Sequence, residues 1–154
     1  IRHNVATAGL FKLSRRGLVD GHKELAVAAQ YKERMNIRSH SVLQKAGSLS
    51  GGNQQKVVLS KWLYTDADVL ILDEPTRGID VGAKFEIYTL INKMVEEGKA
   101  VIVISSELEE ILGVSDRIYT LAYGHITGEV KADDATQENL MELMTIEPAR
   151  EEQK

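Results

Sequence analysis

Apolar and polar positions along the first half of the chain predict helices. Helical spacing of the apolar side chains predicts a short helix within residues 2–15, a longer one over 21–37 and a third over 51–64. Arg15-Arg16-Gly17 is expected to end the first of them. The polar stretch 38–50 between the second and third helices predicts a loop.

The second half of the chain predicts strands and helices in alternation. The apolar runs 69–72 and 100–104 are typical of strands covered on both faces. A helix over 82–97, ended by Gly98, joins them, so the order predicts an α/β fold with a parallel sheet. Because two such strands make too small a sheet, we expect further strands before Ile1 or a partner that covers the edge.

The last third of the chain predicts a short helix, a hairpin and a final helix. Residues 107–112 form the short helix, and alternating positions over 117–122 and 125–130 predict a hairpin around Tyr123-Gly124. Asp133 or Asp134 is expected to favour the start of a helix over 136–144. Residues 147–154 are expected to form a charged tail.

Composition narrows the possible classes of protein. The chain has 154 residues, of which 43% are hydrophobic and 27% charged, as in an ordinary globular domain. A net charge of -4 leaves no electrostatic footprint for nucleic acid, and the absence of cysteine excludes a disulfide framework. No apolar run approaches the length that spans a bilayer. Because the chain does not begin with Met, we expect it to be a piece of a longer protein.

Two carboxylates follow the first predicted strand. Parallel strands direct their carboxyl ends into the crevice where ligands bind, so Asp73 and Glu74 are placed for chemistry there. Asp73 suits Mg²⁺, which prefers hard oxygen ligands. Glu74 suits the orientation of a water molecule beside a terminal phosphate and the removal of its proton. A plainer interpretation is a capping turn after a core strand.

The segment Leu49-Ser-Gly-Gly-Asn-Gln-Gln-Lys56 opens the third predicted helix. Ser50 suits the N-cap position, and Gly51 and Gly52 expose N–H groups that suit a phosphate oxygen. A simple N-cap with glycines for a tight turn would explain the same residues. The chain contains no Gly-x4-Gly-Lys-Ser/Thr phosphate loop.

Together these motifs resemble the ABC-type ATPases. The segment from Leu49 to Lys56 is similar to their signature motif. Val69-Leu-Ile-Leu-Asp-Glu-Pro-Thr76 resembles the Walker B strand with its glutamate, and Arg77-Gly-Ile-Asp80 resembles the D-loop. The Asn-Gln-Gln-Lys variant is most similar to the second ATPase domain of bacterial importers of ribose, galactose and xylose. The resemblance covers nearly the whole sequence and implies part of a P-loop NTPase fold.

The resemblance implies two ATP molecules held between a head-to-tail pair of ATPase domains. Implied ATP contacts are Ser50, Gly51, Gly52, Gln54 and Asp80. The first three residues would touch ATP held by the other domain, and Asp80 would lie at the dimer seam. Asp73 would bind Mg²⁺ and Glu74 would be catalytic at ATP held by this domain's own phosphate loop, so the chain alone is expected to be inactive.

The resemblance also implies an organisation and a set of partners. Residues 1–48 would form the helical subdomain, 49–146 a portion of the ATPase core with a C-terminal hairpin, and 147–154 the tail. Partners would be the N-terminal ATPase domain of the same chain, membrane permease subunits and, indirectly, a periplasmic sugar-binding protein, but no nucleic acid. The protein is then expected in the cytoplasm, peripheral on the inner membrane, where ATP hydrolysis drives uptake of a monosaccharide.

Ser106 departs from the family pattern, which usually has histidine at this position, in contact with the γ-phosphate. A serine donates a hydrogen bond but carries no imidazolium charge, so this domain's own catalytic site is expected to be weakened. Two alternatives stay open. One is a soluble ABC ATPase of ribosome or DNA metabolism, which the acidic charge disfavours. The other is a non-catalytic regulatory module, which intact Asp73-Glu74 disfavours.

Overall fold

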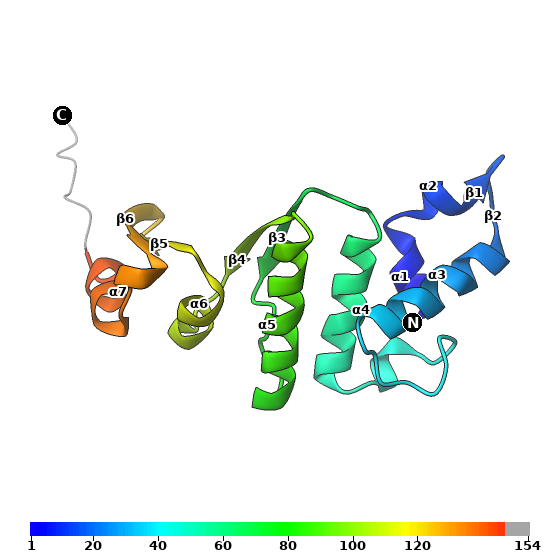
Figure 1. Cartoon of the computed structure of the whole chain (residues 1–154), viewed down its shortest axis with the longest axis horizontal. Coiled ribbons are helices and arrows are strands. Elements are labelled where there is room, and N and C mark those ends of the chain that lie inside the picture. The colour runs from blue at the N-terminus through cyan, green and yellow to red at the C-terminus, as the bar shows by residue number, and fades with distance from the viewer. Residues whose placement is uncertain (147–154) are drawn as a thin grey trace. The chain divides into compact units, whose positions relative to one another are not determined.

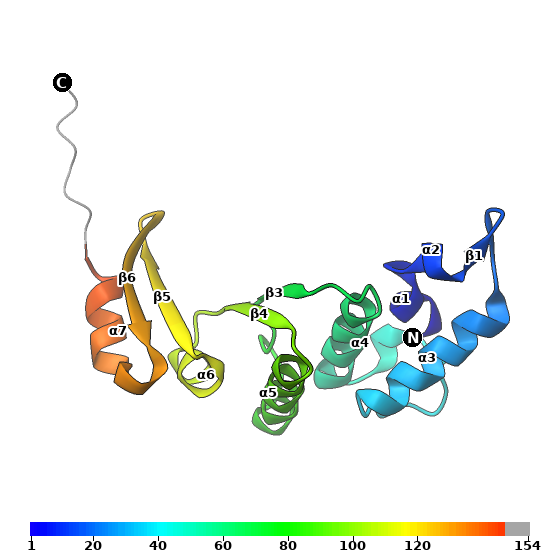
Figure 2. The same cartoon turned by 45° about the horizontal axis from the view of Figure 1, so that its top comes forward.

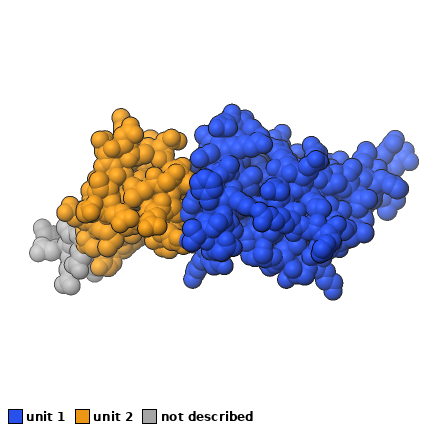
Figure 3. All heavy atoms as spheres, turned by 60° about the horizontal axis from the view of Figure 1, so that its bottom comes forward, with its two compact units in different colours: residues 1–102 blue, residues 103–154 orange. Residues whose placement is uncertain are grey.

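The computed structural model of the chain describes residues 1–146 and divides into two compact units (Figure 3). Unit 1 comprises residues 1–102 and unit 2 begins at Val103. Each unit is described by itself. The charged tail predicted over 147–154 lies outside the described residues. No helix among residues 1–146 has both the length and the apolar character needed to cross a membrane.

Unit 1 begins with a helical part, visible at the blue end of Figures 1 and 2. Its elements are α1 (Arg2–Thr7), α2 (Leu10–Leu13), β1 (Ser14–Arg15), β2 (Leu18–Val19), α3 (Gly21–Arg34), the short helix η1 (Ala46–Ser48) and α4 (Gly51–Leu63). The helices predicted over 21–37 and 51–64 are confirmed. The single helix predicted within 2–15 is wrong, because the helix is interrupted at Gly9, whose backbone is not helical. A side chain at Gly9 would lie 2.6 Å from the Tyr64 ring.

The predicted helix end at Arg15-Arg16-Gly17 is instead the tip of a hairpin. Arg15 pairs with Leu18, which leaves Arg16 and Gly17 as a two-residue turn with φ of 54° and 81°. A turn of this kind requires positive φ at both central residues, which glycine accepts and arginine disfavours. The two strands are too short to carry a pattern of alternating polarity, so the sequence gives little sign of them.

Helices α1, α3 and α4 pack together around a small apolar core. Its buried members are Val5, Ala6, Ala28, Tyr31, Met35, Ile37, Val57 and Leu63. A buried carboxylate, Glu24 on α3, accepts hydrogen bonds from Arg2 at 2.6 Å and contacts His3 at 2.8 Å. Helix α2 is joined to the end of α4 by Lys12, whose Nζ donates to the carbonyls of Tyr64 at 3.0 Å and Thr65 at 3.1 Å.

A two-stranded parallel sheet follows, made of β3 (Val69–Asp73) and β4 (Ala100–Ile104). The strands are joined by α5 (Val81–Glu96), after which Gly98 has φ of 87°, as a C-terminal glycine should. Leu70 and Leu72 are buried. Val69 and Ile71 are 54% and 66% exposed, so the expectation of strands covered on both faces is wrong for the described chain. The packed helices of unit 1 bury only the Leu70 and Leu72 side of β3.

Unit 2 consists of a hairpin with a helix packed on it. Its elements are α6 (Leu108–Val114), β5 (Arg117–Ala122), β6 (His125–Lys131), the short helix η2 (Ala132–Asp134) and α7 (Gln137–Met144). The predicted antiparallel hairpin is confirmed, and Tyr123 and Gly124 form its turn with φ of 50° and 81°. Leu143 of α7 lies so close to Gly128 that a side chain at position 128 would come within 2.7 Å of it.

The helix predicted over 136–144 is confirmed as α7, and its capping residue is one that the prediction did not name. Thr136 is its N-cap and forms a reciprocal capping box with Asn139, with hydrogen bonds of 3.2 Å and 2.9 Å. Asp133 and Asp134 belong to the preceding turn η2 instead. Thr136 can accept the backbone N–H of Asn139 directly, which an aspartate two or three residues earlier is too far away to do.

Candidate functional site

The first turn of α4 lacks the side-chain cap that the sequence predicts. Ser50 occupies the N-cap position with an extended backbone, but its hydroxyl accepts no backbone N–H. Its Oγ instead accepts a hydrogen bond of 2.8 Å from Nδ2 of Asn53. The amide donors of the first turn therefore have no side-chain acceptor, which leaves a positive helix end suited to an anion.

The two glycines after Ser50 allow α4 to lie against the start of α5. A Cβ at Gly52 would lie 2.5 Å from the Cβ of Ala83, and a Cβ at Gly51 would lie 3.1 Å from Cγ2 of Ile79. Any side chain at position 52 would therefore push the two helix starts apart. The signature-like turn and the D-loop-like turn are thus in direct contact within unit 1.

Asp80 caps the helix that follows the D-loop-like turn. Its Oδ1 accepts the backbone N–H of Ala83 at 2.9 Å, and its side chain is exposed. The cap explains the residue type locally. A role for Asp80 at a dimer seam stays a prediction.

The strand-end carboxylates lie next to this contact. Asp73 is exposed at the last position of β3, and Glu74 follows with φ of 47°. Positive φ is unfavourable for a residue with a Cβ and persists only where the surroundings impose it, which is common at functional sites. Gln55 of α4 donates from Nε2 to the carbonyl of Pro75 at 2.8 Å. Helix α4 is therefore joined to the segment that carries Glu74.

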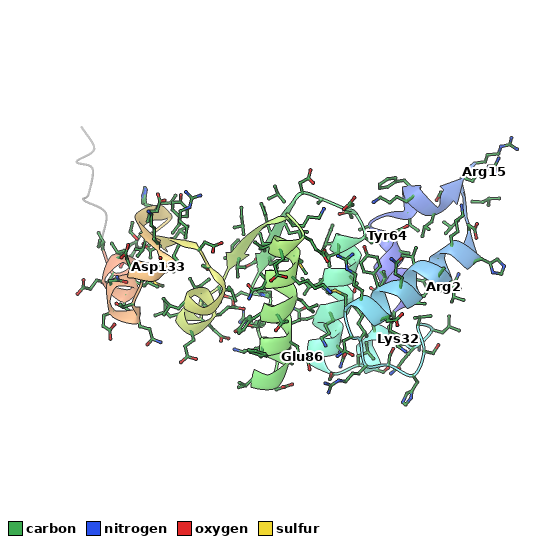
Figure 4. All side chains as sticks on the ribbon, viewed as in Figure 1. Arg2, Arg15, Lys32, Tyr64, Glu86 and Asp133 are labelled. Carbon is green, nitrogen blue, oxygen red and sulfur yellow. The ribbon has the colours of Figure 1, made fainter. Side chains whose placement is uncertain are left out.

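A charged cluster of Arg38, Lys56 and Glu86 joins α4 to α5. Lys56 is 2% exposed, and its Nζ donates to a carboxylate oxygen of Glu86 and to the carbonyl of Asn36 at 3.1 Å. The other oxygen of Glu86 accepts Nη2 of Arg38 at 3.0 Å. The hydrogen bond from Lys56 holds the pKa of the Glu86 carboxyl below its ordinary value, against the effect of desolvation. Glu86 is labelled on α5 in Figure 4.

A groove of about 550 Å³ opens beside the first turn of α4. The residues that line it are mostly of polar type and come from the loop before α4 and from the helix start: Arg38, Ser39, His40, Gln44, Ser48, Leu49, Ser50 and Asn53. The volume falls in the range of small-ligand sites, and Ser50 contributes to its wall. The groove is where a molecule held against Ser50 from outside the chain would have room.

The remaining predicted residues lie apart from this arrangement. Gln54 is exposed and donates from Nε2 to the carbonyl of Leu49 at 2.8 Å, so its amide stabilises the turn from which it comes. Ser106 is exposed in the turn after β4 and belongs to unit 2. The structure therefore brings Ser50, Gly52 and Asp80 together with the segment of Glu74. The predicted role of Ser106 beside the γ-phosphate stays a prediction.

Sequence reasoning missed two residues that organise the site. Asn53 contacts Ser50, and Gln55 contacts Pro75. The first has a recognisable signal, because a Ser-x-x-Asn pattern at a helix start places the amide within reach of the serine. The second has none, because Gln55 and Pro75 are 20 residues apart and meet only through the packing of α4 beside β3.

Comparison with known proteins defines the class of this arrangement. The sequence profile of the family described as ABC transporter matches residues 3–77, which include the signature-like turn and the strand-end carboxylates. A dimeric ATP-binding cassette solved in a post-hydrolysis state with ADP and Pi has the same fold, with a TM-score of 0.68, 24% identity, and coverage of 84% of this chain and 56% of that one. The fold is that of an ATP-binding cassette, and residues 3–77 of the chain match the ABC transporter family.

Similar sequences occur among sugar transport proteins. The L-arabinose transport ATP-binding protein AraG of Geobacillus stearothermophilus is 54% identical over 145 residues, which cover 94% of this chain and 28% of AraG. The ribose import ATP-binding protein RbsA of Bacillus subtilis is 52% identical over 145 residues, which cover 94% of this chain and 29% of RbsA. The chain thus spans less than a third of the length of these relatives.

The residues present fit a nucleotide with its metal ion. Among residues 1–146 no cluster of three or more His, Cys, Asp or Glu side chains forms a metal cage. Asp73 and Glu74 offer two carboxylates, and Mg²⁺ needs only one or two when phosphate oxygens and water complete its shell. The open first turn of α4 supplies N–H donors for phosphate on a different element.

Proposed function

We propose that the protein containing this chain is an ATPase that couples ATP hydrolysis to the uptake of a monosaccharide. The observation that carries the proposal is the close approach of the uncapped first turn of α4 to the D-loop-like turn and the start of α5. Glu74 is joined to the same helix through Gln55 and Pro75. The sugar transport roles in the names of AraG and RbsA support the choice of substrate class.

The roles of the chain's own residues follow from their chemistry. Ser50 and the N–H groups of Gly51 and Gly52 would bind phosphate oxygens of ATP held by another ATPase domain. Asp73 would hold Mg²⁺, which supplies charge neutralisation on phosphate when bound. Glu74 would orient the attacking water and accept its proton on a carboxylate oxygen at a second ATP. The backbone strain at Glu74 supports a role beyond packing.

The proposed partners are a second ATPase domain of the same protein and membrane permease subunits, which would hold the ATPase at the cytoplasmic face of the membrane. A periplasmic sugar-binding protein would act indirectly, through the permease. Co-purification of the full-length protein with a permease would support this assignment. Co-purification with ribosomes would instead support the alternative of a soluble ABC ATPase.

We further propose that the two catalytic sites are unequal, because Ser106 stands where the family usually has histidine. The experiment measures ATP turnover of the full-length protein with Ser50→Ala or Glu74→Gln, and with Glu96→Gln as a matched control on the exposed side of α5. We expect the Ser50 variant to lose more turnover than the Glu74 variant, and the control to be unchanged. Turnover abolished by Glu74→Gln and untouched by Ser50→Ala would contradict the asymmetry.

A further inference from the structure

We infer that Asn53 is a positioning residue, which directs the hydroxyl proton of Ser50 toward a bound phosphate. The inference rests on the proposed function of Ser50 and adds a residue to it. It is drawn from two hydrogen bonds of one side-chain amide, made to the backbone of Arg38 and to the hydroxyl of Ser50.

The orientation of the Asn53 amide is fixed by chemistry. Its Oδ1 lies 2.8 Å from the backbone nitrogen of Arg38, and a backbone N–H only donates. The oxygen must therefore face Arg38, so the NH₂ group faces Oγ of Ser50, also at 2.8 Å. An amide turned the other way would set two donors against each other at Arg38.

The fixed amide determines what the serine hydroxyl can do. A hydroxyl has one proton to donate and two lone pairs that accept. Because Asn53 donates to Oγ, one lone pair of Ser50 is used and its proton stays available. A phosphate oxygen only accepts, so a hydroxyl with an available proton is the form that binds it. A carboxylate at position 53 would have the opposite effect, since it would take that proton for itself.

The same contact explains why Ser50 does not cap α4. An N-cap serine normally accepts a hydrogen bond from a backbone N–H of the first turn. Such a bond would occupy the serine oxygen and would also remove that N–H from anion binding. Here the Asn53 side chain donates in place of the backbone, and the structure shows no side-chain cap at Ser50. The hydroxyl proton and the first-turn N–H groups are thus both available as donors, which favours one kind of ligand, an anion of the phosphate class.

Arg38 is itself bound to a residue of α5. Its guanidinium donates to Glu86, whose second oxygen binds the buried Lys56. Lys56 also donates to the carbonyl of Asn36, two residues before Arg38. The backbone N–H that orients Asn53 is therefore fixed by contacts to two helices, α4 and α5, within unit 1.

The test is a double-mutant cycle in the full-length ATPase, with kcat and KM for ATP measured for Ser50→Ala, Asn53→Ala and the double variant. We expect Asn53→Ala to lower kcat/KM about tenfold when Ser50 is present, which corresponds to about 1.4 kcal/mol. In the Ser50→Ala background the same change should alter kcat/KM less than about twofold. Asn53→Asp should lower kcat/KM more than Asn53→Ala, while Asn92→Asp, an exposed control on α5, should leave it unchanged.

The outcomes separate this inference from the proposed function. A tenfold loss on Asn53→Ala that is equally large in both backgrounds would overturn the inference, because a purely structural role does not depend on the Ser50 hydroxyl. Unchanged kcat/KM on Asn53→Ala, with a clear loss on Ser50→Ala, would overturn the inference and leave the proposed function standing. Unchanged kcat/KM on Ser50→Ala would overturn both the inference and the proposed role of Ser50 in binding phosphate.

Discussion

Replacement of Gly52 by alanine tests the contact between the starts of α4 and α5. The added Cβ would lie 2.5 Å from the Cβ of Ala83, while carbon atoms in contact normally lie about 3.5–4.0 Å apart. The two helix starts must therefore separate by about 1 Å or more, and overpacking of this kind costs about 1–3 kcal/mol. Alanine gains back up to about 1 kcal/mol of helix propensity. We expect a net destabilisation of about 0–2 kcal/mol once the full gain in propensity is subtracted.

The assay is equilibrium urea denaturation of Gly52→Ala, Ala83→Gly and the double variant. Ala83→Gly alone should destabilise by about 1 kcal/mol through propensity, because it puts glycine into the first turn of α5. The double variant exchanges the two residues across the contact, so it should be more stable than the sum of the single effects by about 1–2 kcal/mol. If the effects of Gly52→Ala and Ala83→Gly simply added in the double variant, the two positions would not be in contact and the close approach would be refuted.

Three further predictions concern other parts of the chain. Asp80→Ala should lose about 1 kcal/mol of stability, whereas Asp80→Asn should keep it, because both Asp and Asn accept the N–H of Ala83. A fall in ATP turnover with Asp80→Asn at unchanged stability would then reveal a role beyond the cap. Glu86 has a folded-state pKa below its ordinary 4.5, so the stability it contributes is present above that pH and is lost as pH falls through the folded value; Glu86→Gln should flatten the dependence of the unfolding free energy on pH below about 4.5. Tyr123→Asn should stabilise by about 0.5–1 kcal/mol in thermal denaturation, because Tyr123 has φ of 50° and is 69% exposed, and a fall in the melting temperature would contradict this.

Long elements with a clear period were predictable from the sequence, and their contacts were not. The spacing of apolar residues predicted α3, α4, α5 and the β5–β6 hairpin with boundaries within a few residues. The hairpin at Arg16-Gly17 escaped prediction because strands of two residues carry no period and arginine is disfavoured in such a turn. The open face of β3 was also missed, since an apolar run such as Val69–Leu72 does not say what covers it.

The candidate site was predictable in its residue types but not in its connections. Ser50, Gly52 and Glu74 stand out in the sequence because their motifs are distinctive. Their proximity depends on tertiary contacts over long separations, such as Gln55 with Pro75 and Gly52 with Ala83. The misassigned cap at Ser50 has a similar cause, because propensity predicts the position of a capping residue but not which donor its oxygen accepts.

The attachment of Lys12 to the far end of α4 gives that helix a mechanical role. Helix α4 has 13 residues and is therefore about 20 Å long, with Lys12 bound to the carbonyls that follow its last turn and Ser50 at its first turn. A rod of that length, tilted by about 10° at the Lys12 end, displaces its other end by about 3.5 Å, which is slightly more than one hydrogen-bond length. A small rotation of the α1–α2 region is thus enough to make or break a contact at Ser50.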